Sequence, residues 1–200
     1  MVTEQIRRDT RSLSGVIALW SGVVAAAATG GLYMAIPAIS VAPLVLVGVI
    51  LPFLVYRRSP RFQAVVAAIG LRRLTAFHSW RILAGAMFLW FLAQDRLPHA
   101  FARYAGWGDI LVGLAAIAVV LLPLSRGRYL GFHVVGLLDL VNALALGIFY
   151  TLAADPRMDT IRMLPMALIP LFGVGVTGAS HLIAFDVLRR QAFDRRLALT

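Results

Sequence analysis

The 200-residue sequence contains no cysteine and no lysine. Without cysteine, disulfide bonds, thiolate metal sites and iron–sulfur clusters are excluded. Without lysine, a retinal Schiff base and lysine-dependent covalent catalysis are excluded as well. No GxSxG, P-loop or GxGxxG motif is present, so the sequence indicates no catalytic residue. An enzyme is therefore less expected than a binding, transport or structural protein.

Charged residues are also scarce, at 14% of the chain, whereas 60% of the residues are hydrophobic. Soluble domains are usually about one-quarter charged. A soluble core built from 200 residues cannot bury so much apolar surface, but a bilayer can surround helices that are apolar on nearly all sides. The composition therefore predicts an all-α, multi-pass membrane protein, with the lipid bilayer as its surroundings.

Charged residues and helix breakers divide the chain into six predicted membrane-spanning helices within one transmembrane domain, 1–200. No charged residue occurs between Ser12 and Tyr56, a stretch long enough for two helices of about 20 residues each. Pro165 and Pro170 are expected to bend the sixth helix. The predicted spans are about 13–35, 39–56, 75–94, 101–123, 130–153 and 160–187.

The arginines predict how the helices cross the membrane. Of the 19 basic residues, 14 fall on the side that carries both termini, four on the opposite side, and Arg81 inside a span. Positive charge is enriched in cytoplasmic loops, so both termini are predicted in the cytoplasm, at a bacterial inner membrane. The segment 57–73 has a short apolar centre between arginines, which predicts a short helix in the membrane interface. Because the net charge of +10 follows this pattern, nucleic acid is not an expected partner.

Three charged residues lie well inside predicted spans, more than two residues from either end: Arg81, Asp109 and Asp139. A charge at membrane depth costs several kcal/mol unless it is paired or hydrated, which makes each residue a candidate for ligand or proton binding. Asn142 is one helical turn from Asp139 and joins these candidates. Arg81 and Asp139 both lie towards the cytoplasmic side, so they are expected to pair.

Asp109 is expected nearer the opposite face, about six residues into the span 101–123. At 1.5 Å per residue, this places it roughly 15–20 Å from Arg81. Asp109 is therefore expected to contact the outer turn through Arg96 or Arg103, and not to pair with Arg81. Its alternative role is a proton or ligand site.

His78, His133 and His181 are expected on three different helices at similar depth on the cytoplasmic side. Two such imidazoles could hold a b-type haem, and three could hold a metal ion. The alternative is that they are amphipathic residues facing lipid headgroups. Gly173, Thr177 and His181 share one face of the last predicted span, which can line a pocket or receive another helix.

One stretch of about 35 residues has a recognisable pattern of small, aromatic and charged residues: Trp80-Arg81, Gly85, Phe88-Leu89, Leu97-Pro98, Phe101-Ala102, Ala105-Gly106, Gly108-Asp109 and Gly113. It resembles a pattern in small, uncharacterised bacterial multi-pass membrane proteins. The resemblance implies that Arg81, the Leu-Pro turn and the Gly-Asp pair belong to one structural unit. It implies no activity.

The leading functional hypothesis is that a polar cavity in the last four predicted helices binds or transports a small solute or a proton. In it, Arg81 would attract an anionic group while Asp109 or Asp139 changes protonation. The alternatives are a haem- or metal-binding redox module that uses the histidines, and a non-catalytic scaffold that assembles with a partner subunit or with further copies of itself.

Overall fold

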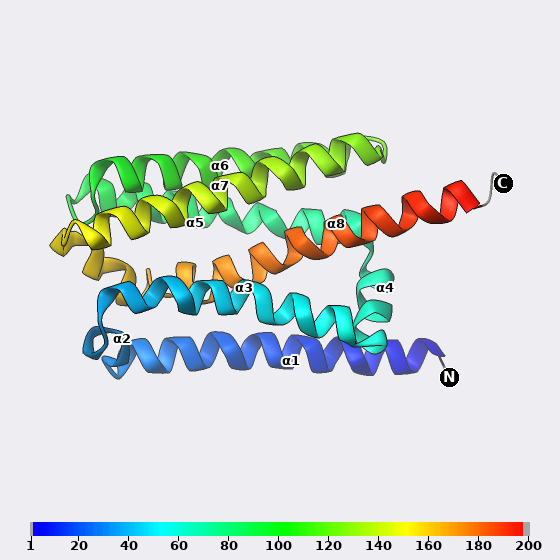
Figure 1. Ribbon diagram of the computed structural model, residues 1–200, viewed down its shortest axis with the longest axis horizontal. Coiled ribbons are helices and arrows are strands. Elements are labelled where there is room, and N and C mark those ends of the chain that lie inside the picture. The colour runs from blue at the N-terminus through cyan, green and yellow to red at the C-terminus, as the bar shows by residue number, and fades with distance from the viewer. Residues whose placement is uncertain (1, 198–200) are drawn as a thin grey trace.

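The computed structural model describes the backbone of residues 2–197 and the side chains of residues 4–190. The side chains of the basic C-terminal residues 191–200, which contribute to the arginine count, lie outside this part. Every regular element in the described part is a helix, and the long helices run along a common axis (Figure 1). Six segments are long and apolar enough to cross a membrane: Glu4–Thr29, Ala38–Arg58, Pro60–Ala93, His99–Leu121, Arg126–Leu152 and Ile169–Arg190. The prediction of six such helices is confirmed.

The first helix, α1 (Val2–Thr29), begins earlier and ends earlier than the predicted 13–35. It ends because Gly31 adopts a φ of +74°, in the left-handed region that glycine tolerates best. The short helix α2 (Leu32–Ala35) and the 3-10 turn η1 (Ala38–Ser40) then lead into α3 (Val41–Arg58).

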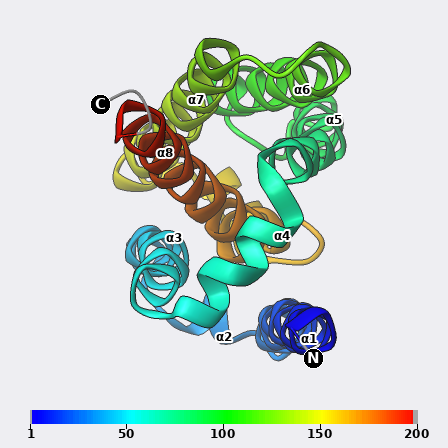
Figure 2. The same cartoon turned by 90° about the vertical axis from the view of Figure 1, so that its right-hand side faces the viewer.

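The segment between the second and third predicted spans forms α4 (Pro60–Ala76), which is longer than the predicted short helix. Its N-terminus is capped by Ser59, whose hydroxyl accepts a hydrogen bond from the backbone N–H of Phe62 at 3.2 Å. Gly70, at φ +77°, bends it. In Figure 2, α4 runs across the end of the bundle, from α3 towards α5.

The third predicted span, 75–94, is not one regular helix. The end of α4 passes into a 3-10 turn, η2 (Phe77–Trp80), before α5 (Arg81–Ala93) begins. After a tight turn, α6 (His99–Leu121) returns antiparallel to α5, and α7 (Arg126–Leu152) follows. These two helices agree with the predicted 101–123 and 130–153 to within a few residues.

Glycines bring α5 and α6 into close contact. A Cβ atom on Gly85 would meet the backbone carbonyl of Gly106, and a Cβ atom on Gly113 would lie 2.9 Å from the backbone nitrogen of Ile82. Small residues let helix backbones approach closely in this way. The small residues in the 80–113 pattern therefore join α5 and α6 into one packed hairpin.

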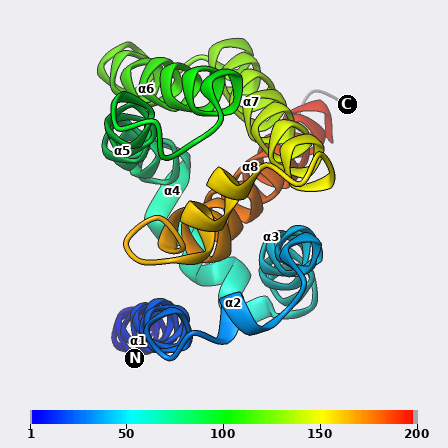
Figure 3. The ribbon, with the colours of Figure 1, turned by 90° about the vertical axis from the view of Figure 1, so that its left-hand side faces the viewer.

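The prediction of a sixth helix over 160–187 is wrong for the first third of that range. The chain forms the 3-10 segment η3 (Pro156–Arg162), passes through an irregular turn at 163–168, and becomes helical again only at the π-turn η4 (Ile169–Gly173). Pro165 lies in that irregular turn, so the proline ends the helical path there instead of bending it. Figure 3 looks onto the end of the bundle where this segment lies, and η3 contacts α2, η1 and α7.

The last helix, α8 (Val174–Leu197), forms the centre of the bundle. In its most apolar stretch 67% of the residues are buried, against 6% in α1. Figure 2 shows α8 between α3 and α7, and α8 contacts both of them. The first residues of α1 and the last residues of α8 lie at the same end of the bundle (Figure 1).

At the opposite end, the buried side chain of Arg162 ties η3 to the first half of the chain. Its Nε donates to the carbonyl of Tyr33 at 2.8 Å, and its Nη2 donates to the carbonyl of Ile36 at 2.6 Å. In the sequence analysis Arg162 is one of the four basic residues on the side opposite the termini, with no further role. Its guanidinium satisfies backbone carbonyls where α2 ends and no regular helix continues.

Candidate functional site

A buried cluster of charged side chains joins α5, α6 and α7. Arg81 is the first residue of α5, and its side chain is 1% exposed. Its Nε donates to Oδ1 of Asp109 at 2.6 Å, its Nη2 donates to Oδ2 of Asp139, and its Nη1 donates to the carbonyl of Gly136 at 3.2 Å. We call Arg81, Asp109 and Asp139 the charged cluster.

The expected pair of Arg81 and Asp139 is confirmed, but the expectation that Arg81 does not pair with Asp109 is wrong. Measured from the turn that joins the two helices, Arg81 lies about 18 Å along α5 and Asp109 about 15 Å along α6, at 1.5 Å per residue. The two residues are therefore level with each other. Asp109 points into the bundle, and among the described residues it forms no ion pair with Arg96, in the turn between α5 and α6, or with Arg103, on α6.

Gly108 makes room for the second carboxylate. A Cβ atom on Gly108 would collide with the carboxylate of Asp139, so the absence of a side chain lets that group pass beside α6 to reach Arg81. The Gly108-Asp109 pair thus supplies both a carboxylate and the space for its partner. Asn142, by contrast, is exposed on α7, and among the described residues it takes no part in the hydrogen bonds of this cluster.

The charged cluster carries one guanidinium and two carboxylates, a net charge of −1 when all three groups are ionised. Asp109 uses only Oδ1 for its contact with Arg81; among the described residues, its Oδ2 takes part in no hydrogen bond. An uncompensated negative charge in an apolar environment is costly. The cluster is therefore suited to accept a proton, a cation or a hydrogen-bond donor.

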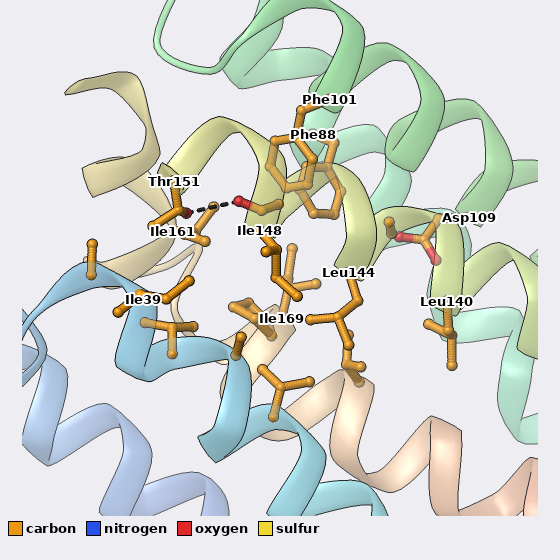
Figure 4. Close-up of a pocket in the computed structure, with 18 residues that line it drawn as sticks. Ile39, Phe88, Phe101, Asp109, Leu140, Leu144, Ile148, Thr151, Ile161 and Ile169 are labelled. Carbon is orange, nitrogen blue, oxygen red and sulfur yellow. Dashed lines mark hydrogen bonds between the residues drawn. The ribbon is translucent and has the colours of Figure 1, made fainter. Parts of the chain in front are cut away.

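An apolar groove leads to Asp109 (Figure 4). It is lined by residues from η1, α3, α5, α6, α7, η3 and the start of η4 and α8, and of the 18 lining residues only Asp109 is charged. In Figure 4, Asp109 lies at one end and Thr151 lies towards the other. The hydroxyl of Thr151 donates to the carbonyl of Gly147 at 2.7 Å, so it adds little polarity to the groove.

The three histidines converge on a second buried site. His78 comes from η2, His133 from α7 and His181 from α8, and each is 0% exposed. One ring nitrogen from each lies within 4.8 Å of the others. The ring centroids of His78 and His181 are 4.1 Å apart, and those of His133 and His181 are 5.1 Å apart. The alternative that these histidines face headgroups is wrong, because packed helices enclose them.

Hydrogen bonds hold the histidine rings in place. Nδ1 of His133 and Nδ1 of His181 are 2.9 Å apart, Nε2 of His133 is 3.1 Å from the hydroxyl of Thr75, and Nε2 of His78 is 2.9 Å from the hydroxyl of Ser180. Two buried ring nitrogens, Nδ1 of His78 and Nε2 of His181, have no partner among the described residues. Sequence reasoning missed Thr75 and Ser180, because nothing in their spacing distinguishes them from other small polar residues.

Gly136 lies between the two sites. Its carbonyl accepts the hydrogen bond from Arg81, and a Cβ atom on it would lie 2.8 Å from Nε2 of His181. Only glycine leaves room for the His181 ring against α7 at this point. The charged cluster and the histidines are therefore neighbours that share one residue of α7.

The small-residue face of the last helix receives another element, which is one of the two uses predicted for it. The ring of Trp80 fills the space beside Gly173, and its Nε1 donates to the hydroxyl of Thr177 at 3.1 Å. One turn further on, His181 belongs to the histidine site. The face thus packs against η2 at Gly173 and Thr177, and one turn later it contributes His181 to the histidine cluster.

Asp186 is a buried acid that the sequence analysis did not identify as a candidate. It accepts hydrogen bonds from three side chains: Tyr56 at 3.0 Å, Arg57 at 2.6 Å and Arg190 at 2.6 Å. Arg189 and Arg190, three and four residues later, were a sequence signal for this pairing. Because Tyr56 and Arg57 belong to α3 and Asp186 belongs to α8, these hydrogen bonds hold α3 against α8.

The fold and these sites define a class: in the described residues, an all-α bundle of helices long and apolar enough to cross a membrane, which enclose a buried charged cluster and a buried histidine cluster. The chain belongs to a protein family described as a domain of unknown function (DUF8737), whose model matches residues 36–189. That range contains the groove and both clusters, and it leaves out α1. No curated protein and no solved structure matches the chain.

Proposed function

We propose that this protein is an integral protein of the bacterial inner membrane that binds an amphiphile dissolved in the lipid. The apolar part of the ligand would occupy the groove, and its polar end would donate a hydrogen bond to Oδ2 of Asp109. The observation that carries the proposal is that an apolar groove ends at an unpaired oxygen of a buried carboxylate.

The chemistry of the groove favours this class of ligand over a polar solute. Its walls are almost entirely hydrocarbon, and apolar ligands are stabilised in proportion to the area that they bury. Ile39, in the groove wall, is 41% exposed, so the groove is open towards the surface of the bundle. In a membrane that surface would face lipid, from which an amphiphile could enter directly.

The charge of the cluster favours a donor, and above all a cationic donor, as the polar group of the ligand. With Arg81 bound to both carboxylates, an additional positive charge near Asp109 would bring the net charge from −1 to zero. In a low-dielectric environment such compensation is worth far more than in water. A hydroxyl group would donate a weaker hydrogen bond to Oδ2 of Asp109. An ether or ester has no hydrogen to donate and would form no hydrogen bond with this oxygen.

The proposal includes an orientation, with both termini in the cytoplasm and α4 in the cytoplasmic interface. The start of α1 and the end of α8 share one end of the bundle, α4 runs across that end, and most arginines of the chain belong to it. Arginines concentrate on the cytoplasmic side of membrane proteins.

The test is native mass spectrometry on protein released from mild detergent. Ala143 lines the groove, whereas Ala145, on the same helix, is exposed away from it. The wild type is expected to carry a bound amphiphile. Ala143→Trp is expected to reduce its occupancy about tenfold by overfilling the groove, and Ala145→Trp, the matched control, to leave it unchanged.

Two results would contradict the proposal. One is equal occupancy in all three proteins, which would place the amphiphile on the outer surface of the bundle. The other is a wild type that carries no small molecule. If that protein instead retains a partner subunit or a second copy of the chain, the scaffold alternative is the better account.

A further inference from the structure

We propose that His78 and His181 form a binding site for a transition metal ion, with Nδ1 of His78 and Nε2 of His181 as ligand atoms and with Ser180 and His133 orienting the two rings. This site is separate from the groove, and the inference does not depend on the proposed amphiphile.

The hydrogen bonds determine which nitrogen of His78 carries the proton. Ser180 has one hydroxyl hydrogen, and it is donated to the carbonyl of Thr177 at 2.7 Å. The Ser180 oxygen must therefore accept the hydrogen bond that joins it to Nε2 of His78 at 2.9 Å. A neutral imidazole carries one proton, so Nδ1 of His78 is left with a bare lone pair. That nitrogen is buried and has no partner among the described residues.

The same reasoning applies to His181. One of the two Nδ1 atoms of His133 and His181 must donate across their 2.9 Å contact. If His133 donates, an N–H group on Nε2 of His181 is buried without an acceptor, which is rare in proteins. If His181 donates, its Nε2 keeps a bare lone pair. The proton of His133 is then on Nε2, and this N–H group donates a hydrogen bond to the hydroxyl oxygen of Thr75. The second arrangement leaves no N–H group of these rings unpaired.

The resulting arrangement is the one that metal-binding histidines use. Such a histidine presents one nitrogen to the ion and donates its other ring N–H to a neighbouring acceptor, which holds the ring in place. His78 donates to Ser180, and His181 donates to His133. A metal ion would partner the two nitrogens that now have none.

The donor set indicates the class of ion. Imidazole suits zinc, copper and nickel, whereas magnesium and calcium prefer oxygen ligands. Zinc–nitrogen bonds of about 2.0–2.1 Å hold two ligand nitrogens roughly 3.4 Å apart. One ring nitrogen from each of the three histidines lies within 4.8 Å of the others, so binding an ion requires the rings to move closer together. The neighbouring charged cluster, at net −1, offsets part of the charge of the ion.

The geometry favours a bare ion over haem. A haem between two axial histidines needs a slot that admits the whole porphyrin plane. Here the centroids of His78 and His181 are 4.1 Å apart, and the ring of Phe132 packs at 5.4 Å and 6.0 Å from them. The backbone of Gly136 also lies directly against His181. These contacts leave no slot for a macrocycle.

The test uses the full-length protein in mild detergent, stripped with a chelator and titrated with Zn²⁺ and, separately, with Co²⁺. The wild type is expected to bind one equivalent of Zn²⁺ and to show the visible d–d bands of nitrogen-ligated Co²⁺. His78→Ala and His181→Ala are expected to lose both signals. His99→Ala, which alters an exposed histidine in the outer turn, is the matched control and keeps them.

Ser180 provides a test that leaves both ligands in place. Ser180→Ala removes the acceptor that orients His78 and is expected to weaken Zn²⁺ binding about 10–100-fold. Ser180→Thr restores the hydroxyl and is expected to recover most of the affinity. A purely structural role would change the thermal stability of both variants without this difference in affinity.

The proposal is overturned if the stripped wild type binds no stoichiometric Zn²⁺ or Co²⁺, or if His99→Ala removes the binding. It is also overturned if folded His181→Ala, with an unchanged elution volume and helix content, still binds one equivalent. If the histidine variants do not fold, the comparison of Ser180→Ala with Ser180→Thr decides, since equal affinities in these two proteins exclude the assigned role of Ser180.

Discussion

Replacing Arg81 by methionine should destabilise the bundle by about 3–5 kcal/mol, the usual cost of removing one partner from a buried ion pair. Methionine keeps much of the apolar length of the side chain but leaves two buried carboxylates without their cation. The Coulomb attraction within each ion pair is about 4 kcal/mol at an effective dielectric constant of 20 and a charge separation of about 4 Å, but the cost of removing both charges from water offsets much of it. Most of the expected cost is therefore the penalty on the carboxylates that remain.

A second, stricter prediction concerns the stability of the triple variant with Arg81→Met, Asp109→Asn and Asp139→Asn. Neutralising the stranded carboxylates should recover about 2 kcal/mol or more relative to Arg81→Met alone, because replacing a whole buried ion cluster is often nearly neutral. The single variant is thus expected to be less stable than the triple variant.

The assay is unfolding in mixed micelles with increasing SDS, followed by far-UV circular dichroism. Arg103→Met, at an exposed position on α6, is the control and should stay within about 0.5 kcal/mol of the wild type. The reasoning is refuted if Arg81→Met loses less than about 1 kcal/mol, which is the range of exposed ion pairs, or if the triple variant is no more stable than Arg81→Met.

Three further predictions follow from the packing and the surface charges. Gly85→Ala should destabilise the bundle by about 1–3 kcal/mol in the same assay, because its Cβ would meet a backbone carbonyl of α6, while Gly127→Ala, which meets nothing within 4 Å, should not. Hydrogen bonds from Arg157 lower the pKa of Asp155, so this ion pair stabilises the fold above the unfolded pKa of about 3.9; the stability difference between wild type and Asp155→Asn should shrink as the pH falls below that value, and a constant difference would exclude the linkage. Asp186→Asn should separate α3 from α8, measured as faster amide exchange in both helices, and unchanged exchange would show that the buried carboxylate does not fasten them.

Hydropathy was sufficient to predict the number and approximate position of the long helices, because it reports directly on apolar length. It could not predict their ends. The polar start of α1 is helical from Val2, where Glu4 and Arg8 form an ion pair at 3.0 Å one turn apart, a local stabilisation that hydropathy does not register. Near Pro165 the tertiary contacts of η3 replace a helix that apolar composition alone would favour.

The candidate residues were visible in the sequence, but their partners were not. Arg81, Asp109, Asp139 and the three histidines stand out because polar groups are rare in apolar spans. Which of them meet depends on the depth and rotation of each helix. The ends of α5 and α6 at their shared turn were predicted to within one and two residues, yet this did not place Asp109 level with Arg81, and no periodicity on one helix reveals that histidines from three elements converge.

The claim that the groove presents the carboxylate of Asp109 to a ligand can be measured most directly with three fluorescent probes that share one hydrocarbon chain and end in a primary amine, a hydroxyl or a methyl ether. For the wild type we predict binding in the order amine, hydroxyl, ether, with about tenfold or more between amine and ether, since hydrogen bonds to a charged group contribute about 1.5–3 kcal/mol. Asp139→Asn leaves Asp109 in the groove but brings the charge of the cluster to zero, so it should weaken the preference for the amine over the hydroxyl and keep both above the ether. Asp109→Asn should abolish the preference for the amine. Equal binding of all three probes by the wild type, or an unchanged preference in Asp109→Asn, would contradict the account.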